Sequence, residues 1–408
     1  MAGPDKVKMV LTAEGRVRPR VLQKLDEAAN TKIMSVCPGK IVTGPSAKQL
    51  QGAPVGSIMH PVFGPLRTYF RGWSSDSSLR WRAAAGGSLT TFATFLLETG
   101  KVQKVLHVRA NPKDPTQTDA LISSSPSEAA SGCQSRYGPA APLVHVMQLL
   151  DEGVVFAVVA KPCDIAAIRA LAKTDPRIEQ QIPYCLSIFC GGLPSRGAAL
   201  AMAKYHEIQE DDIGVCRFRG HGWPGLMTLG RRSDGSEYGT TYNQTWKWAG
   251  NPLGPRVGLA KYDIQWRCKI CPDAVGELAD VTCPDGWLYD FEKKCHVSVD
   301  GSDPGQNLVL ARTSRGEELV NEILAAGKLH VSAIDIREIE QMHFDHYPRK
   351  CSWPLRVWMM YLFKQPASLQ VQMYRPWICL YLAGFQKAWQ VFRGVISRLH
   401  SKANEEPR

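Results

Sequence analysis

Residues 154–171 read VVFAVVAKPCDIAAIRAL, which is a strand pattern followed by a turn and a helix pattern. Seven consecutive apolar residues predict a buried strand over 154–160, and apolar residues at helical spacing predict a helix over 165–171. The same alternation occurs on either side, with helices predicted at 89–97 and 142–150 and strands at 102–108 and 186–189. Alternating strands and helices are typical of an α/β core, which we expect to extend to about residue 210.

The composition of the chain changes outside this core. Residues 1–78 mix charged segments with Gly and Pro turns and are expected to be loop-rich. Beyond residue 215, short extended runs with a strand predicted at 308–312 and a helix at 317–326 indicate an α+β part. We therefore expect a mixed two-part architecture, α/β followed by α+β, with the segments 1–78, 79–214, 215–350 and 351–408.

Overall composition indicates a folded protein of ordinary type. The 408 residues are 44% hydrophobic and 21% charged, which favours neither disorder nor a fibrous structure. The net charge is +11, but the basic residues are scattered, so a solvated basic surface is favoured and nucleic acid is not expected as a partner. No signal peptide is visible at the N-terminus, so we expect a cytoplasmic protein with reduced thiols.

The segment 351–408 is basic, aromatic and amphipathic. Gln386 and Lys387 interrupt the apolar run at 376–400, and neither apolar run of this segment is long enough to span a bilayer. We expect no transmembrane segment. Two interpretations stay open, namely a helix that packs on the body of the protein and peripheral contact with a membrane surface.

Two of the 12 cysteines have the spacing of metal ligands, Cys268 and Cys271. Cys163 and Cys190 follow predicted strands, at the edge where α/β sheets place functional side chains. Four thiolates can bind zinc or an iron-sulfur cluster, although an isolated cysteine is more often a buried inert thiol. A structural zinc ribbon usually has two CxxC pairs, and this chain has one.

A glycine-rich turn, Gly86-Gly87-Ser88-Leu89-Thr90, comes directly before the helix predicted at 89–97. Backbone N–H groups at a helix N-terminus attract anions, and glycine lets a phosphate approach closely. The alternative is a simple helix cap with Ser88 as the capping residue. The spacing fits neither a P-loop nor the GxGxxG fingerprint.

Seven motifs occur in a fixed order: AAGGS at 84–88, LLETGKV at 96–102, SGCQSRY at 131–137, KPCDI at 161–165, FRGHGWPG at 218–225, CKICPD at 268–273 and AD at 279–280. As an ordered set over about residues 60–350, they resemble the beta-subunit family of the coenzyme F-420 hydrogenases and dehydrogenases. That family includes 7-hydroxymethyl chlorophyll a reductase. Chlorophyll-reductase members have further N-terminal cysteines, whereas here Cys37 alone precedes residue 133, so a second cluster is not expected.

The resemblance implies FAD and a [4Fe-4S] cluster near the junction of the two parts, with ferredoxin or coenzyme F-420 as the electron partner. By position, the cluster ligands would be Cys163, Cys190, Cys268 and Cys271, with Cys283 as a rival ligand. The flavin would contact residues of three motifs: Gly86, Gly87, Ser88, Thr90, Ser135, Tyr137, Arg219 and Trp223. A partner subunit of a hydrogenase or dehydrogenase is also implied.

A catalytic acid is harder to assign from the sequence. His221 lies in the 218–225 motif and has a side-chain pKa suited to proton delivery, although a surface or phosphate-binding histidine fits equally well. His343 and His346 are expected in an exposed loop. Three functions stay open: an iron-sulfur flavoprotein reductase, an electron-transfer subunit without its own substrate, and a zinc-stabilised binding protein.

Overall fold

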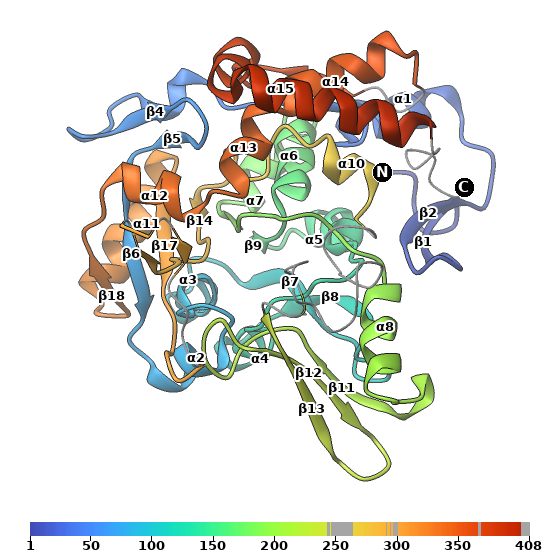
Figure 1. Ribbon diagram of the computed structural model, residues 1–408, viewed down its shortest axis with the longest axis vertical. Coiled ribbons are helices and arrows are strands. Elements are labelled where there is room, and N and C mark those ends of the chain that lie inside the picture. The colour runs from blue at the N-terminus through green and yellow to red at the C-terminus, as the bar shows by residue number, and fades with distance from the viewer. Residues whose placement is uncertain are drawn as a thin grey trace.

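The computed structural model describes residues 1–242, 245, 264–290, 292–293, 295–296, 301–365 and 369–400. Its centre is an eight-stranded mixed sheet (Figure 1). In spatial order the strands are β18 (Leu329–Ser332), β6 (Thr68–Ser74), β17 (Asn307–Ala311), β14 (Val281–Thr282), β10 (Cys185–Ser187), β9 (Phe156–Val159), β7 (Lys104–Ala110) and β8 (Thr118–Ser123). The strands β14, β10, β9 and β7 are parallel to one another. Each of the other strands, β17, β6, β18 and β8, pairs antiparallel with its neighbours.

Helices cover both faces of this sheet because its strand residues alternate between two hydrophobic clusters. Val105, Ala157 and Leu186 pack with helices α3 (Ser88–Glu98) and α11 (Ser314–Ala325). The opposite face, with Leu106 and Phe156, packs with α5 (Val146–Asp151), α6 (Pro162–Leu171) and α7 (Arg177–Gln181). Side chains point to opposite faces at every second strand residue, so this alternation produces three layers. The predicted α/β class is confirmed.

The helices and strands predicted around residues 154–171 are present within a few residues of their expected bounds. Strands from both sides of residue 214 pair in the one sheet, since β14 lies between β10 and β17. The segment expected to be loop-rich contains β1 (Val7–Leu11), β2 (Val17–Val21), α1 (Glu27–Val36), β3 (Ile41–Thr43), β4 (Ile58–His60), β5 (Gly64–Leu66) and β6, with a short 3-10 helix at Ala47–Leu50.

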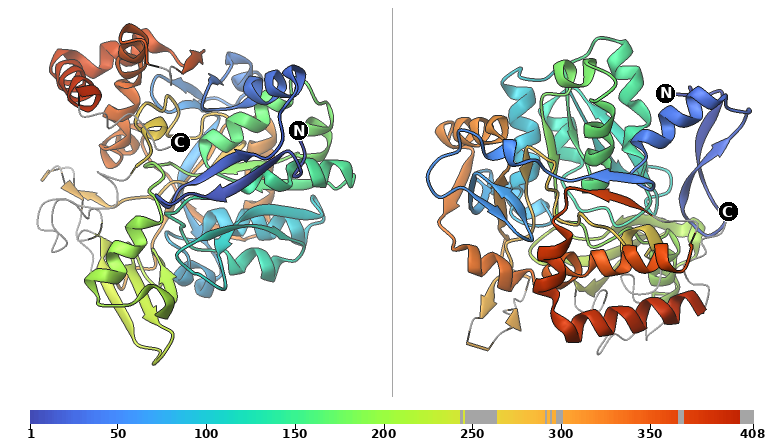
Figure 2. Two further views of the ribbon diagram at one scale, coloured as in Figure 1. Left: turned by 90° about the vertical axis from the view of Figure 1, so that its right-hand side faces the viewer. Right: turned by 90° about the horizontal axis from the view of Figure 1, so that it is seen from above.

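Smaller units surround the sheet (Figure 2). They comprise α2 (Ser77–Arg82), α4 (Pro126–Ser131), α8 (Gly197–Tyr205), α10 (Trp266–Lys269), α12 (Ile336–Met342), a three-stranded antiparallel sheet of β11 (Ile213–Arg217), β12 (Leu226–Arg231) and β13 (Glu237–Thr241), and the hairpin of β15 (Tyr289–Asp290) and β16 (Cys295–His296), with 3-10 turns at Pro142–His145 and Glu210–Asp212. The C-terminal segment forms α13 (His346–Cys351), α14 (Trp353–Leu362), β19 (Gln370–Gln372) and α15 (Pro376–His400). Strand β19 pairs in parallel with β3, which joins the two ends of the chain.

Candidate functional site

A cavity of about 230 Å³ lies where the parallel strands end. Its walls come from four parts of the chain: the start of α3, the loop at 132–138, the residues that follow β9, and the loop at 188–193. Arg219, Asp285 and Asn307 also line it. The carboxyl ends of parallel strands are where open α/β sheets bind ligands, so the position fits a binding site. The volume is below the roughly 300–1,000 Å³ of a typical ligand pocket, which suits part of a dinucleotide better than the whole.

The start of α3 supplies backbone donors to this cavity. Leu89 and Thr90 line it, and they lie in the first helical turn, whose N–H groups have no intrahelical acceptor. Gly87 is the N-cap, in a left-handed conformation with φ 77°. A Cβ on Gly86 would lie 2.7 Å from Cα of Gln306, so glycine is needed there for close backbone packing.

Ser88 has a structural role rather than a place in the cavity wall. Its backbone N–H donates to Oδ1 of Asn307 (3.0 Å), and its hydroxyl donates to the carbonyl of Gly72 (3.0 Å). The side chain is fully buried. Of the four residues predicted in this turn, Gly87 and Thr90 line the cavity, while Gly86 and Ser88 hold the turn in position.

The predicted residues of the other two flavin motifs meet at the far wall. Ser135 and Tyr137 line the cavity, and Arg219 Nη1 donates to the Tyr137 hydroxyl (3.5 Å). Arg219 is 1% exposed and binds Asp285 through both carboxylate oxygens (2.7 and 2.9 Å). Burial opposes the charge of Arg219, but Asp285 outweighs it and raises the pKa of the guanidinium. Its positive charge is therefore balanced within the protein.

Trp223 and His221 lie behind this wall rather than in it. Trp223 is 2% exposed, its indole N–H donates to Asp285 (3.4 Å), and its ring packs on Trp287 at 5.0 Å. His221 is exposed, with φ 59°, and does not line the cavity. Its partial burial, followed by the charge of Arg217, lowers its pKa. The structure thus places the predicted proton donor on the outer side of the loop.

The four predicted ligand cysteines lie together next to the cavity. Cys163 follows β9 in the first turn of α6, Cys190 follows β10, and Cys268 and Cys271 flank the end of α10. Burial raises the pKa of Cys190 to about 11, and the next largest contribution to this rise comes from the charge of Cys268. Burial also raises the pKa of Cys163 well above its usual range, with Asp164, Cys190 and Cys271 adding to it. The charges of Cys190 and Cys271 act on Cys163, and those of Cys268 and Cys271 act on Cys190, so each thiol lies within reach of the charge of at least one other.

Cations surround this set of thiols. Lys161 lines the cavity, donates to Asp164 (2.6 Å) and feels the charges of Cys163 and Cys190; these acidic groups outweigh burial and raise its pKa. Arg267 is held by the Pro38 carbonyl (2.7 Å), and Cys271 followed by Cys163 overcomes burial to raise its pKa. Buried positive charges next to thiols favour the thiolate form, which is the form that binds metal.

Arg349 on α13 ties two of the cysteine-bearing loops together. Its guanidinium donates to the carbonyls of Cys190 (3.4 Å), Gly191 (2.5 Å) and Cys268 (2.5 Å). The loops are also in direct contact, since a Cβ on Gly192 would lie 3.5 Å from Cβ of Cys268. Arg349 therefore fixes the relative position of Cys190 and the CxxC pair.

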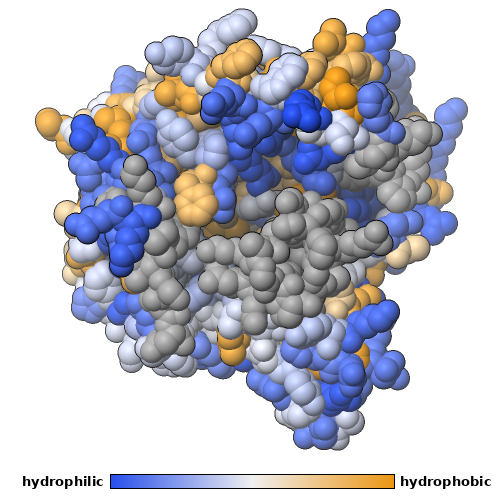
Figure 3. All heavy atoms as spheres, in the orientation of Figure 1, coloured by the Kyte–Doolittle hydropathy of each residue, from blue (hydrophilic) through white to orange (hydrophobic). Residues whose placement is uncertain are grey.

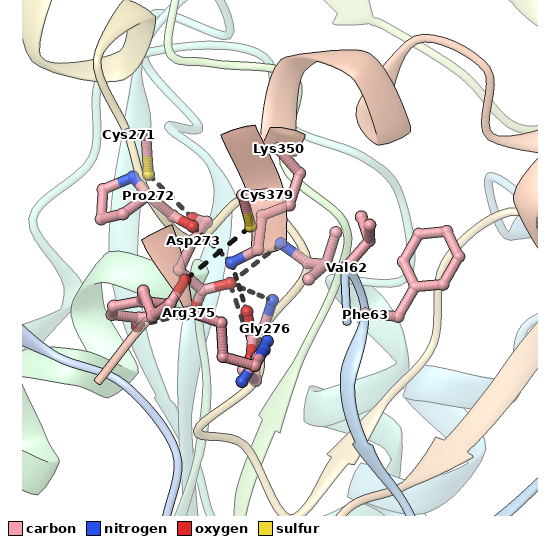
Figure 4. A network of polar contacts seen from close by, with 12 residues as sticks. Val62, Phe63, Cys271, Pro272, Asp273, Gly276, Lys350, Arg375 and Cys379 are labelled. Carbon is pink, nitrogen blue, oxygen red and sulfur yellow. Dashed lines mark hydrogen bonds and ion pairs between the residues drawn. The ribbon is translucent and has the colours of Figure 1, made fainter. Parts of the chain in front are cut away.

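A buried ion network supports the CxxC loop from below (Figure 4). The fully buried Glu277 carboxylate binds both Lys350 and Arg375 (2.5 Å to the latter). Lys350 also donates to the carbonyl of Pro272, and the Cys271 thiol donates to the carbonyl of Asp273 (2.8 Å). Burial opposes the ionisation of Glu277, but Lys350 and then Arg375 outweigh it and lower its pKa. The network fixes the residues that follow Cys271.

Cys283, the rival ligand, differs from these four. Cys283 lines the cavity but belongs to the apolar core, and burial alone raises its pKa. Within the described residues, no group of three or more His, Cys, Asp or Glu side chains is placed to hold a single metal ion. A four-iron cluster makes a different demand, because each of four thiolates binds a different iron. The donor set of four neighbouring thiols with adjacent cations fits such a cluster.

Several residues of this region were not predicted from the sequence. Lys161 stands in the KPCDI motif and could have been found there, whereas Asp285 and Arg349 stand in no motif. His343 and His346 were expected in an exposed loop, which is wrong, because His343 is 3% exposed and His346 is half-buried at the start of α13. Their rings pack on Phe189 at 4.7 and 5.5 Å, and Phe189 lines the cavity. The apolar pocket that holds them is formed by residues far away in the sequence.

The chain matches family models, a relative of known sequence and a solved structure. Residues 69–148 match the family model for the N-terminal part of the coenzyme F420 hydrogenase/dehydrogenase beta subunit, and residues 155–337 match the model for its C terminus. The coenzyme F420 hydrogenase subunit beta of Methanococcus voltae is 24% identical over 286 residues, which cover 67% of this chain and 86% of that protein. A chain of the F420-reducing [NiFe] hydrogenase complex from Methanosarcina barkeri superposes with a TM-score of 0.57 at 16% identity, covering 77% of this chain and 98% of that one.

Proposed function

Since the chain belongs to the coenzyme F420 hydrogenase/dehydrogenase beta-subunit family, we propose that it is an iron-sulfur flavoprotein that transfers electrons between a [4Fe-4S] cluster and FAD. One observation carries the proposal: the loop at 188–193 both lines the cavity and bears Cys190, whose thiol neighbours Cys268 and Cys271. A cluster on the four cysteines and a flavin ring in the cavity would therefore share a wall. When bound, the cluster would supply single electrons and the flavin would combine two of them with a proton for hydride chemistry.

The residues of the chain have distinct roles in this proposal. Cys163, Cys190, Cys268 and Cys271 are the ligands, and Lys161 offsets negative charge between them and the cavity. The first-turn N–H groups of Leu89 and Thr90 bind an anionic part of the flavin. Tyr137 and Ser135 form the opposite wall, and the Arg219–Asp285 pair keeps that wall rigid.

Cofactor content after anaerobic purification tests the cluster. We expect about four irons and four sulfides per chain and one flavin, as the chemistry of a [4Fe-4S] flavoprotein requires. Cys271→Ser is expected to lose iron, whereas Cys283→Ala, which alters a thiol on the cavity wall outside the set, is expected to retain it. Zinc in place of iron, or equal iron in both variants, would contradict the assignment.

Ferredoxin or coenzyme F-420 is the proposed electron partner, and reduction or oxidation of an organic substrate or of F-420 is the proposed reaction. A second candidate is a beta subunit that has no independent substrate. The structural match covers 98% of one chain of a hydrogenase complex, which favours this second candidate. Turnover by the isolated protein with reduced ferredoxin or reduced F-420 supports an autonomous reductase; a loaded protein that exchanges electrons but turns over no substrate alone supports the subunit.

A further inference from the structure

Helix α15 carries a row of exposed aromatic side chains. Trp377, Tyr381, Phe385 and Trp389 are spaced four residues apart and are 73%, 85%, 85% and 53% exposed. Residues four apart share one face of a helix, and the exposure of Tyr381 and Phe385 shows that both lie outward on either side of the kink at Gly384. We call these four residues the aromatic stripe.

The stripe is not the face by which α15 packs on the protein. Cys379, Val391 and Val395 form the buried face, and Val391 and Val395 pack with Met359 of α14. Figure 1 and the right view of Figure 2 both place α15 at the edge of the molecule. Along the upper edge of the molecule in the orientation of Figure 1, Figure 3 shows hydrophobic orange side chains among pale and hydrophilic blue ones.

The surface around the stripe is positively charged. Residues 346–400 contain eight Lys and Arg and no Asp or Glu. Lys350 and Arg375 bind the buried Glu277, but Lys364, Lys387 and Arg393 form no ion pair within the described part of the chain. The stripe is thus an aromatic face bordered by cations, on a helix that contains no Asp or Glu. Asp345, which precedes α13, lines the same cavity as Lys387.

Exposed Trp and Tyr next to Lys and Arg are the features by which a helix lies in the interface of an anionic bilayer. No helix among the described residues is long and apolar enough to cross a membrane, so contact would be peripheral. The stripe also lies beyond residue 337, where the match to the family models ends. A subunit contact made by the part of the chain that the family models cover would therefore not use the stripe. We propose that the aromatic stripe of α15 docks this protein onto the surface of an anionic lipid membrane.

Vesicle co-sedimentation of the cofactor-loaded full chain tests this proposal. The protein is expected to bind vesicles made of an equal mixture of phosphatidylcholine and phosphatidylserine. It is expected to bind vesicles of pure phosphatidylcholine less well. Replacing all four stripe residues by Ser is expected to lower the partition coefficient at least roughly tenfold, because each ring loses its apolar contact with the bilayer. A charge variant, Lys387→Glu with Arg393→Glu, is expected to lose the preference for phosphatidylserine.

The matched control changes exposed apolar residues elsewhere. Val21→Ser with Leu22→Ser alters side chains that are 57% and 51% exposed, and it should leave vesicle binding within about twofold of the parent, as expected if only the stripe contacts lipid. Iron and flavin content check that each variant is folded. Equal partition of the parent and the stripe variant would overturn the proposal. So would a parent that binds no vesicles and dimerises through the stripe, which light scattering on the same variants would show.

Discussion

Neutralising Glu277 tests whether the buried ion network holds the CxxC loop. Glu277 and Lys350 both have fully buried side chains, and Arg375 is 15% exposed. The variant Glu277→Gln keeps the size of the side chain but removes its charge. Lys350 then stays buried without a counter-charge, and the new amide NH₂ would face a donor of Lys350 or Arg375.

Breaking one partner of a buried ion pair costs about 3–5 kcal/mol, and the retained amide oxygen of Gln places the expected loss of unfolding free energy near 3 kcal/mol. The loss should shrink in acid. Lys350 and Arg375 lower the folded-state pKa of Glu277, so its stabilisation is present above the ordinary glutamate pKa of 4.5 and is lost as pH falls through the folded-state value. Parent and variant should therefore converge in stability at low pH.

Urea unfolding of the apoprotein, followed by tryptophan fluorescence, measures this loss. Glu322→Gln is the control, because its pair with Lys101 is 44% and 31% exposed and should contribute less than about 1 kcal/mol. The double variant Glu277→Gln with Lys350→Met removes the unpaired ammonium and should recover at least half of the loss. A change below about 1 kcal/mol for Glu277→Gln, or a double variant no more stable than the single one, would refute the reasoning.

Three further predictions concern the same region. Gly86→Ala should destabilise by about 2 kcal/mol or more in urea unfolding, whereas Gly100→Ala, at nearly the same φ (67° against 66°) but with nothing within 4 Å of the new Cβ, should cost about 1 kcal/mol; equal costs would contradict the close contact with Gln306. Arg349→Gln should increase amide hydrogen exchange of residues 188–193 at least about tenfold, because the hydrogen bonds to two carbonyls of this loop and to the Cys268 carbonyl are lost. Arg356→Gln, which releases the Lys269 carbonyl, should not increase it. Burial lowers the pKa of His107 to about 4, so the unfolded state takes up a proton at a higher pH than the folded state does. The free energy of unfolding should therefore fall by about 3 kcal/mol as pH drops from about 6.5 to 4. In His107→Gln this part of the pH dependence should be absent, and an unchanged pH profile would contradict the lowered pKa.

Sequence patterns predicted the parts of this site that depend on local structure. Cys163 and Cys190 could be placed at one edge of the sheet because each follows a parallel strand, and the turn before α3 could be identified from its glycines. The use of each polar group could not be predicted, because it depends on residues far away in the chain. The two donors of Ser88 go to Asn307 and Gly72, and the charge of Arg219 goes to Asp285.

The clearest case is the pair Arg349 and Lys350 on α13, which stand in no motif yet bind backbone carbonyls beside three of the four cysteines. Consecutive helix residues point about 100° apart, so Arg349 reaches the carbonyls at Cys190 and Cys268 while Lys350 reaches that of Pro272 and the buried Glu277. Both residues lie beyond residue 337, where the family models end. The cysteine loops are therefore held from a segment that the family models do not cover, and α13 joins the site to the C-terminal helices that carry the aromatic stripe. A change at Arg349 or Lys350 is expected to alter the geometry of the thiols without touching any cysteine.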